Sequence, residues 1–229
     1  MNIYFLVEGK SSEKKIYPKW LEYLIPQLNK VQYYDQVEEN NYFLISGKGY
    51  PKTISHGIPN AIDKITEVGK YDYLVICVDA DEETIDARKK YIYDFIQEND
   101  IELGKTKLVL IIQNRCIETW LLGNRKMFNS KQPQEEPLSS YVNYYDVSQD
   151  DPELMGDYDR RNHADFHKIY LKEVFAAKNL RYTEKFPGEA QKEHYLKQLL
   201  KRIDEETEHL QTFQCFVQFC EMINRKINT

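Results

Sequence analysis

The chain has 229 residues, of which 41% are hydrophobic and 13% aromatic, enough to bury one sizeable core and too many for a disordered protein. Its formal net charge of -6 argues against a general nucleic-acid coat, because non-specific affinity comes largely from lysine and arginine at phosphates. A nuclease is not excluded, since a metal ion can supply positive charge locally. No apolar run reaches the length of a signal-peptide core or a membrane span, so we expect a soluble cytoplasmic protein.

Apolar segments of strand length alternate with stretches of helical period in the first half of the chain, which predicts an α/β fold. In chain order, we expect strands over residues 3–7, 42–45, 73–78 and 107–112. The helices expected after them run from residue 11 or 12 to about 24, then over 59–68, 82–99 and 116–122. The predicted architecture is Rossmann-like, with a mainly parallel sheet flanked by helices.

The second half of the chain has a different pattern. Residues 126–162 are rich in Gln, Pro, Ser, Asp and Tyr, which predicts a loop-rich excursion over the surface. Helical periods follow over about 164–177, 188–210 and 212–226. We therefore expect an α/β domain over residues 1–125, the excursion over 126–162, and a helical C-terminal region over 163–229 that packs on the domain.

Acidic residues follow three of the expected strands. Glu8 comes directly after the first strand, Asp79 and Asp81 follow the third, and Glu118 lies a few residues after the fourth. Neighbouring parallel strands are spaced by about 4.8 Å and their carboxyl ends meet in one crevice, so these carboxylates should converge. Oxygen ligands suit Mg²⁺ or Mn²⁺, which complete their shells with water and phosphate oxygens. The pattern predicts metal-dependent phosphodiester chemistry.

Two of these motifs together resemble the signature motifs of the Toprim fold. They are Glu8-Gly9 after one apolar strand and Asp79-x-Asp81 after a later one. More narrowly, VEGKSSEKKIY, the VDAD turn and RCIETWLLG are similar to small Toprim-like proteins of bacterial genome-defence loci, of the overcoming-lysogenization-defect type. The similarity covers roughly residues 1–125. It implies a metal-dependent endonuclease that cuts DNA or RNA, tRNA included, as the effector of an antiphage system.

The resemblance also implies roles for the acidic residues. Glu8 would act as the general acid/base or as a metal ligand, and Asp79 as the principal Mg²⁺ ligand. Asp81 would be a second or water-mediated ligand. Glu13 and Glu118 would build a second metal site. Each of these roles belongs to the resemblance, and none follows from spacing alone.

Basic residues supply the expected substrate contacts. The nuclease members take one lysine from a C-terminal segment to stabilise charge on the phosphate, and Lys185 is the candidate for that catalytic role. The other candidates for substrate binding are Lys10, Arg115, Arg160 and Arg161. The chain has no G-x-x-x-x-G-K-[ST] loop, so we expect any ABC- or AAA-type ATPase partner to be a separate protein. A homodimer is the default oligomer.

Structural interpretations of the same residues stay open. Glu8-Gly9 also suits an ordinary turn into a capped helix, and Asp79 and Asp81 suit the positive end of the next helix. Glu13 and Glu118 suit the start of a helix, where acids are favourable. Lys185 suits a solvated surface. His163 and His167 have the spacing of a zinc site but no obvious third ligand, which favours a polar surface.

Two other functions are consistent with the sequence. The first is a phosphatase in which Asp79 of the D-x-D sequence accepts a phosphoryl group. The second is a catalytically silent Toprim-fold docking or sensor subunit of a nucleic-acid-processing complex. For that subunit, the stripe of Phe213, Phe216, Val217 and Met222 could form an exposed interface, although such stripes are usually buried.

Overall fold

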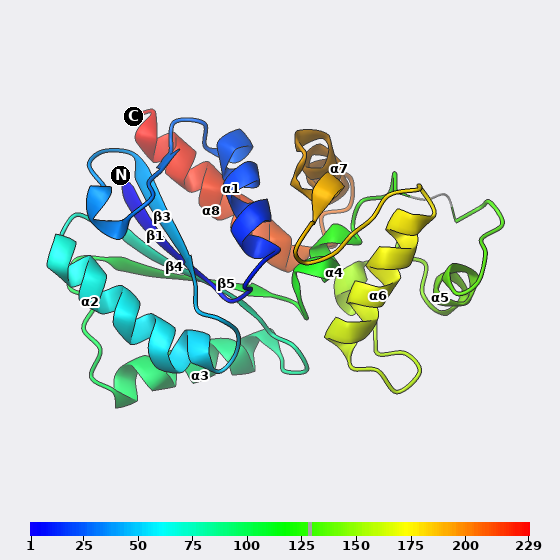
Figure 1. Cartoon of the computed structure of the whole chain (residues 1–229), viewed down its shortest axis with the longest axis horizontal. Coiled ribbons are helices and arrows are strands. Elements are labelled where there is room, and N and C mark those ends of the chain that lie inside the picture. Colours follow the sequence, from blue (N-terminus) through cyan, green and yellow to red (C-terminus); the bar gives the residue numbers. More distant parts are fainter. Residues whose placement is uncertain (128–129) are drawn as a thin grey trace.

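The computed structural model describes residues 1–127 and 130–229, and its centre is a five-stranded sheet in the order β2-β3-β1-β4-β5 (Figure 1). All neighbouring strands are parallel. The strands are β1 (Asn2–Val7), β2 (Asn29–Lys30), β3 (Asn41–Ser46), β4 (Tyr73–Asp79) and β5 (Lys107–Gln113). The predicted α/β class with a parallel sheet is confirmed. The sequence does not predict β2, whose two residues are exposed and carry no apolar signal.

The middle of the sheet explains the continuous apolar runs of β1 and β4. β1 pairs with β3 along one edge and with β4 along the other, and all its residues are buried. β4 is buried in the same way until Asp79, which is partly exposed. Strands covered on both faces need apolar side chains on both faces, so the alternating pattern of a half-exposed strand is absent from them.

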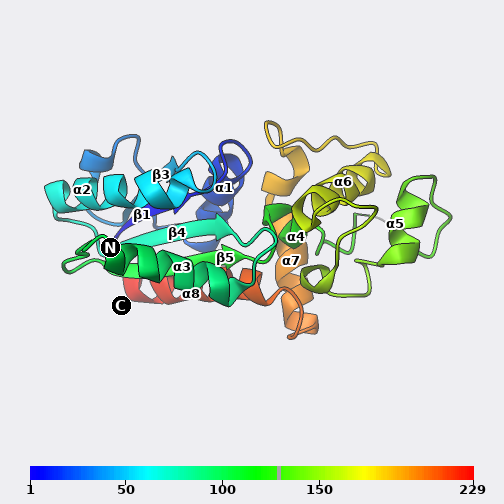
Figure 2. The ribbon, with the colours of Figure 1, turned by 90° about the horizontal axis from the view of Figure 1, so that it is seen from below.

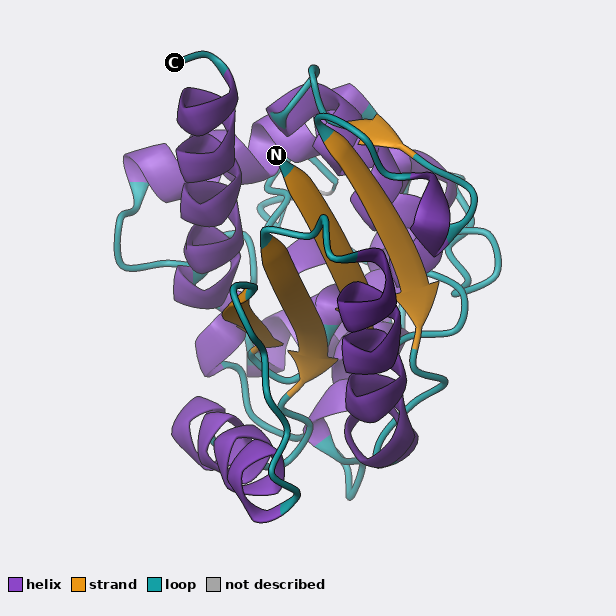
Figure 3. Ribbon diagram, turned by 90° about the vertical axis from the view of Figure 1, so that its left-hand side faces the viewer, coloured by secondary structure: helices purple, strands orange, loops and turns teal. Residues whose placement is uncertain are grey.

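Helices cover the sheet on both faces (Figures 1 and 3). α1 (Glu13–Leu24) and α8 (Gln211–Ile227) lie on one face, whereas α2 (Ile58–Val68) and α3 (Ile85–Glu98) lie on the other. The first strand-helix-strand unit leads from β1 to β3, and the next crosses back past β1 to β4. The loops after β1 and β4 therefore leave in opposite directions and open a crevice at the carboxyl ends of these two strands.

The remaining helices gather beyond that end of the sheet (Figure 2). They are α4 (Ile117–Leu121), α5 (Leu138–Tyr144), α6 (His163–Ala176) and α7 (Glu193–Glu205), with single helical turns at Pro152–Leu154 and Gly188–Gln191. Two more turns, Tyr34–Gln36 and Thr53–Gly57, lie against α2 instead. The predicted excursion thus contains α5, and the helix expected over 188–210 is α7 with a separate turn before it. In the described part of the chain, none of these helices combines the length and apolar character required to cross a bilayer.

The C-terminal helix α8 returns to the sheet and completes its core. Phe213, Phe216 and Val217 are buried. The Phe213 ring lies between Trp20 of α1 and Trp120 of α4, with ring centroids 5.7 Å and 5.4 Å away. Burying an aromatic ring of this size contributes roughly 2–3 kcal/mol. The exposed interface considered for the docking subunit is therefore excluded, because its stripe fills the core.

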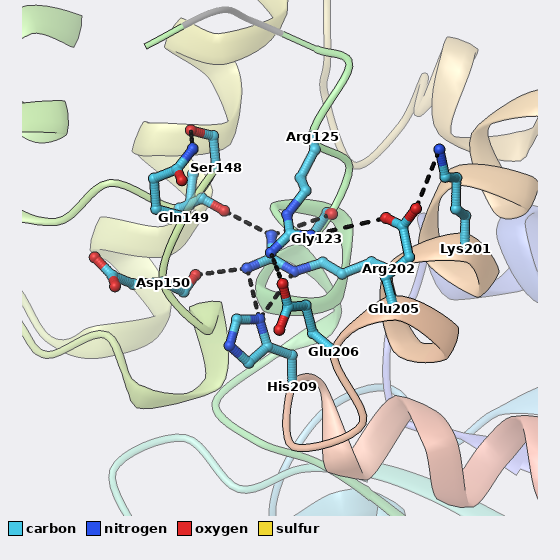
Figure 4. A network of polar contacts seen from close by, with 11 residues as sticks. Gly123, Arg125, Ser148, Gln149, Asp150, Lys201, Arg202, Glu205, Glu206 and His209 are labelled. Atoms are coloured by element: carbon cyan, nitrogen blue, oxygen red, sulfur yellow. Dashed lines mark hydrogen bonds and ion pairs between the residues drawn. The ribbon is translucent and has the colours of Figure 1, made fainter. Parts of the chain in front are cut away.

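Arg202 of α7 ties the long connection after α5 to the helices (Figure 4). Its side chain is only 1% exposed, and its Nη1 donates to the carbonyl oxygens of Val147 at 2.6 Å and Gly123 at 3.3 Å. Nη2 donates to the carbonyl oxygen of Asp150 at 2.6 Å. Carbonyl oxygens that have no strand or helix partner are satisfied here by one buried guanidinium, which fixes the position of the second group of helices.

Candidate active site

A cavity of about 520 Å³ opens at the carboxyl ends of β1 and β4, between the sheet and the second group of helices. Its lining is strongly acidic. Eight carboxylates contribute to it: Glu8, Glu13, Asp79, Asp81, Glu82, Glu118, Asp165 and Glu184. Three lysines also line it: Lys10, Lys48 and Lys168. The formal charge of these side chains is therefore -5, eight negative against three positive groups.

Glu8 connects three segments at the floor of the cavity. Its Oε1 accepts a hydrogen bond from the backbone N–H of Tyr50 at 3.0 Å, and its Oε2 accepts one from the N–H of Asp79 at 3.2 Å. Burial raises the pKa of Glu8, the charge of Asp81 raises it further, and the two N–H groups oppose that rise. The carboxylate is thereby held in one orientation at the end of β1.

Glu13 begins α1, but its side chain points back into the site. Its Oε2 accepts a hydrogen bond from the backbone N–H of Gly9, and its Oε1 accepts one from Nε2 of Gln113 at 3.0 Å. A Cβ at position 9 would meet the end of this carboxylate, so glycine at this turn leaves room for Glu13 to accept the N–H of Gly9. Burial raises the pKa of Glu13 to about 8, and the charges of Glu8 and Glu118 act in the same direction.

Asp79 lies at the centre of the acidic group. Its Oδ1 is buried and has no hydrogen-bond partner among the described residues. Burial raises the pKa of Asp79 well above its usual range, and the charges of Glu13, Glu8 and Glu118 add to the rise. An unpaired buried carboxylate oxygen is costly, so the site favours either a proton or a cation at Asp79.

Glu118 and Asp81 complete the acidic group from two further segments. Glu118 is buried in the first turn of α4, and its Oε1 accepts a hydrogen bond from the hydroxyl of Tyr182 at 2.8 Å. Asp81 is half-exposed and adopts a left-handed backbone with φ of 51°. Its carboxylate lies 3.6 Å from Nη2 of Arg88. Glu118 is thus fixed inside the cavity, whereas Asp81 stands at its rim.

Arg88 was not among the predicted site residues, although it supports this rim. Its side chain is 2% exposed, pairs with Asp81 and Glu83, and lies 4.1 Å from the centroid of the Tyr50 ring. A signal was available in the sequence, because Arg88 interrupts an apolar stripe between Ile85 and Ile92 at helical spacing. A lone basic residue on a buried stripe indicates a buried ion pair or a site.

Only one of the basic residues predicted to contact the substrate lines the acidic cavity. Lys10 lines the cavity, whereas Lys185, Arg115, Arg160 and Arg161 do not. The Lys185 ammonium lies 5.5 Å from the centroid of the Phe186 ring, at the outer end of a tight turn bridged between Thr183 and Phe186. The neighbouring Glu184 points inward instead and pairs with Lys168 at 2.5 Å. Lys168 of α6 is therefore the lysine of the C-terminal half that reaches the cavity.

The arginines outside the cavity have local roles. Nη1 of Arg115 donates to the carbonyl oxygens of Asp81 at 3.0 Å and of Glu83 at 3.3 Å, which holds the turn that presents Asp81. Arg161 pairs with Asp159 at 3.9 Å, and Arg160 is exposed. The loop that carries Arg160 and Arg161 is thus separate from the lining of the acidic cavity.

The two histidines of α6 have separate partners. His167 is buried, its Nδ1 lies 2.7 Å from Oγ1 of Thr119, and burial lowers its pKa to about 4. His163 Nδ1 lies 2.6 Å from the carboxylate of Glu82. The predicted polar surface is wrong for His167, because α6 packs that side chain against α4.

The acidic residues of the cavity suit the predicted metal ion by the kind of atom they offer, although the described residues form no ready-made cluster. Within residues 1–127 and 130–229, no three His, Cys, Asp or Glu side chains stand in a ready-made ligand arrangement. The chemistry of the donors fits a hard cation such as Mg²⁺ or Mn²⁺, because every acidic ligand offers oxygen and the Asp79 Oδ1 is unpaired. A divalent ion would also offset the mutual repulsion of the buried carboxylates.

Comparisons of the chain with protein-family models, with curated proteins and with solved structures found no match. The function must therefore be argued from the cavity itself. Its distinctive features are the buried carboxylates drawn from four separate segments, the unpaired oxygen of Asp79, and the lysines at the rim.

Proposed function

We propose that the chain is a Mg²⁺- or Mn²⁺-dependent nuclease that hydrolyses phosphodiester bonds of DNA or RNA in the acidic cavity. The observation that carries this proposal is the buried, unpaired Oδ1 of Asp79, placed among Glu8, Glu13 and Glu118. A structural carboxylate would have a hydrogen-bond or ion-pair partner in the fold. The Toprim resemblance of Glu8-Gly9 and Asp79-x-Asp81 supports the same chemistry.

Asp79, Glu8 and Glu118 would hold the ion, with Asp81 at the open rim. When bound, such an ion supplies positive charge against the phosphate oxygens and activates water for attack. Two backbone N–H groups fix the Glu8 carboxylate, so it needs little reorganisation during the reaction. Glu13 has a pKa of about 8 and retains a proton at neutral pH, which limits the repulsion in the ion-free protein.

The three lysines of the rim would contact the substrate phosphate. Lys10 follows β1, Lys48 follows β3, and Lys168 projects from α6, so they approach from different elements. Lys168 is paired with Glu184, which keeps its ammonium at the cavity. By the resemblance, we extend the proposal to an effector of antiphage defence that works with a separate ATPase partner.

The proposal is tested with purified protein, plasmid DNA, single-stranded DNA and total tRNA, each with Mg²⁺, Mn²⁺ or EDTA. Asp79→Asn keeps the size of the side chain and removes its charge, and Asp204→Asn on the exposed surface of α7 is the matched control. We expect metal-dependent cleavage that falls by about 100-fold or more in Asp79→Asn, the loss expected for a principal ligand, and is unchanged in Asp204→Asn.

Two results would contradict this assignment. Equal cleavage by Asp79→Asn and the wild type would place the activity elsewhere or in a contaminant. Hydrolysis of p-nitrophenyl phosphate without cleavage of any nucleic acid would favour the phosphatase hypothesis, with Asp79 as the nucleophile.

A further inference from the structure

Another hollow, of about 500 Å³, lies beside the acidic cavity between the end of β3 and helix α2. The side chains around this hollow are basic, in contrast to the acidic lining of the cavity. The charged or ionisable side chains of the rim are Lys48, Lys52, His56 and Lys64, and none of the described residues that line the hollow carries a carboxylate. Lys48 also lines the acidic cavity, so the two hollows meet at this residue. We call this surface the basic groove.

The lysines of the basic groove lie together on one hollow that no carboxylate of the described residues lines. By contrast, Lys168 of the acidic cavity is paired with the carboxylate of Glu184. Lys48 and Lys52 are exposed without an ion pair, and the Lys64 ammonium lies 5.2 Å from the centroid of the Tyr34 ring. In a chain with a net charge of -6, a hollow lined by three lysines and by no described carboxylate is a local positive surface that favours an anionic ligand.

The loop that joins the two hollows is built around Glu8. The carbonyl oxygen of Glu8 accepts a hydrogen bond from the N–H of Gly49 at 3.0 Å, and its Oε1 accepts the one from Tyr50. Before them, Lys48 adopts a left-handed backbone with φ of 72°. At Gly47, a Cβ would come within 2.6 Å of the Thr53 Cα, so the chain passes directly from β3 onto the turn before α2. The hydrogen bonds of Glu8 with Gly49 and Tyr50 therefore also hold the neighbouring Lys48 at the inner end of the basic groove.

We propose that the basic groove binds backbone phosphates of the nucleic-acid strand that enters the acidic cavity. The strand would run along α2 past Lys64 and Lys52 and reach the carboxylates at Lys48. This inference rests on the proposed nuclease function and adds the path of its substrate. Phosphate contacts of this kind position a strand without reading its sequence.

The test measures binding separately from cleavage. Fluorescence anisotropy follows labelled single-stranded DNA and RNA oligonucleotides of equal length on full-length Asp79→Asn protein, which is expected not to cut them. The groove variant carries Lys52→Gln and Lys64→Gln in addition. The matched control carries Lys105→Gln and Lys107→Gln, two exposed lysines at the opposite, amino end of β5, so the net charge changes equally.

We expect the groove variant to bind about 10-fold more weakly than its parent at 0.1 M salt, and the slope of log Kd against log salt to fall by about 1.4, since each phosphate contact on a single strand contributes about 0.7. The control should change Kd by less than about 2-fold, as expected when no phosphate contact is lost. Inorganic phosphate at the same ionic strength should compete weakly, because a strand makes several contacts at once.

Equal weakening in the groove variant and in the control would overturn the proposal, since the effect would then reflect net charge alone. An unchanged slope of log Kd against log salt in the groove variant would also overturn it. If the groove variant binds normally while Asp79→Asn abolishes cleavage in the wild-type background, the groove inference fails and the nuclease proposal stands. If the groove variant loses binding but the wild type never cleaves, the binding surface stands and the nuclease proposal fails.

Discussion

Replacing Asp79 by asparagine should stabilise the protein in the absence of metal while removing its proposed activity. The buried Oδ1 has no hydrogen-bond partner among the described residues. Burial raises the pKa of Asp79 well above its usual range, and the neighbouring carboxylates raise it further. Because the folded-state pKa is raised, the cost of the charge is absent at low pH and appears as the pH rises toward the folded-state pKa. An unsatisfied buried polar group costs about 1–3 kcal/mol, so we expect Asp79→Asn to gain roughly that much at pH 8.

Urea unfolding in EDTA measures this difference. At pH 8, Asp79→Asn should have a larger free energy of unfolding than the wild type. At pH 3, below the pKa of about 3.9 for aspartate in the unfolded chain, the two should nearly coincide. Asp204→Asn, on the exposed surface of α7, should differ by less than about 0.5 kcal/mol at either pH. Added Mg²⁺ should stabilise the wild type, by about 2.7 kcal/mol at a hundred times its Kd, and should have little effect on Asp79→Asn.

A destabilisation of Asp79→Asn at pH 8 would refute this reasoning. It would mean that the carboxylate supports the following helix or turn, as the structural interpretation of Asp79 holds. Stabilisation together with loss of cleavage would instead mark Asp79 as a residue kept for function at the expense of stability, as expected for a ligand that waits for its cation.

Two further predictions concern the second group of helices. Burial raises the pKa of Glu153 to about 7, although its carboxylate accepts hydrogen bonds from the N–H and hydroxyl of Thr212. The stability that the protonated Glu153 contributes is therefore lost as the pH rises from 4.5 to 7. Between pH 5 and pH 8, the free energy of unfolding in urea should fall by roughly 2–3 kcal/mol less in Glu153→Gln than in the wild type. Parallel pH profiles would contradict this. Arg202→Met leaves the carbonyl oxygens of Gly123, Val147 and Asp150 without their donor. The free energy of unfolding should therefore fall by about 3–5 kcal/mol in the same assay. The control Lys201→Met should lower it by less than about 0.5 kcal/mol. A loss below about 1 kcal/mol would show that water replaces the guanidinium.

The sequence predicts the sheet well because its inner strands are buried on both faces. The run from Ile3 to Val7 and the run from Tyr73 to Val78 admit no other period, and their ends locate Glu8 and Asp79. α5 is different. Its segment reads LSSYVNY, and it is held by packing of the Tyr141 ring against Phe166 and Tyr170, at 5.3 Å and 5.6 Å, partners that a local pattern does not contain.

The contacts inside the cavity are harder to predict than its acidic residues. Gln113 donates to Glu13 across a separation of 100 residues, and Arg88 pairs with Asp81 only because α3 turns one buried position toward the rim. The choice between Lys168 and Lys185 depends on a two-residue turn that points Glu184 inward and leaves Lys185 outside. Such relations are set by the packing of α6 and its following loop, and sequence spacing does not encode them.

The two charged surfaces explain how a chain with a net charge of -6 could act on nucleic acid. Eight carboxylates and three lysines in the cavity would repel a phosphate backbone in the absence of a cation. The basic groove carries no carboxylate in its described lining, so it offers the strand an attractive surface that does not depend on metal. Binding and cleavage should then respond to different ions, binding to monovalent salt and cleavage to Mg²⁺ or Mn²⁺. The acidic cavity would weaken the binding of a general nucleic-acid coat, whereas the proposed nuclease would use both surfaces, the basic groove to bind the strand and the acidic cavity to hold the ion.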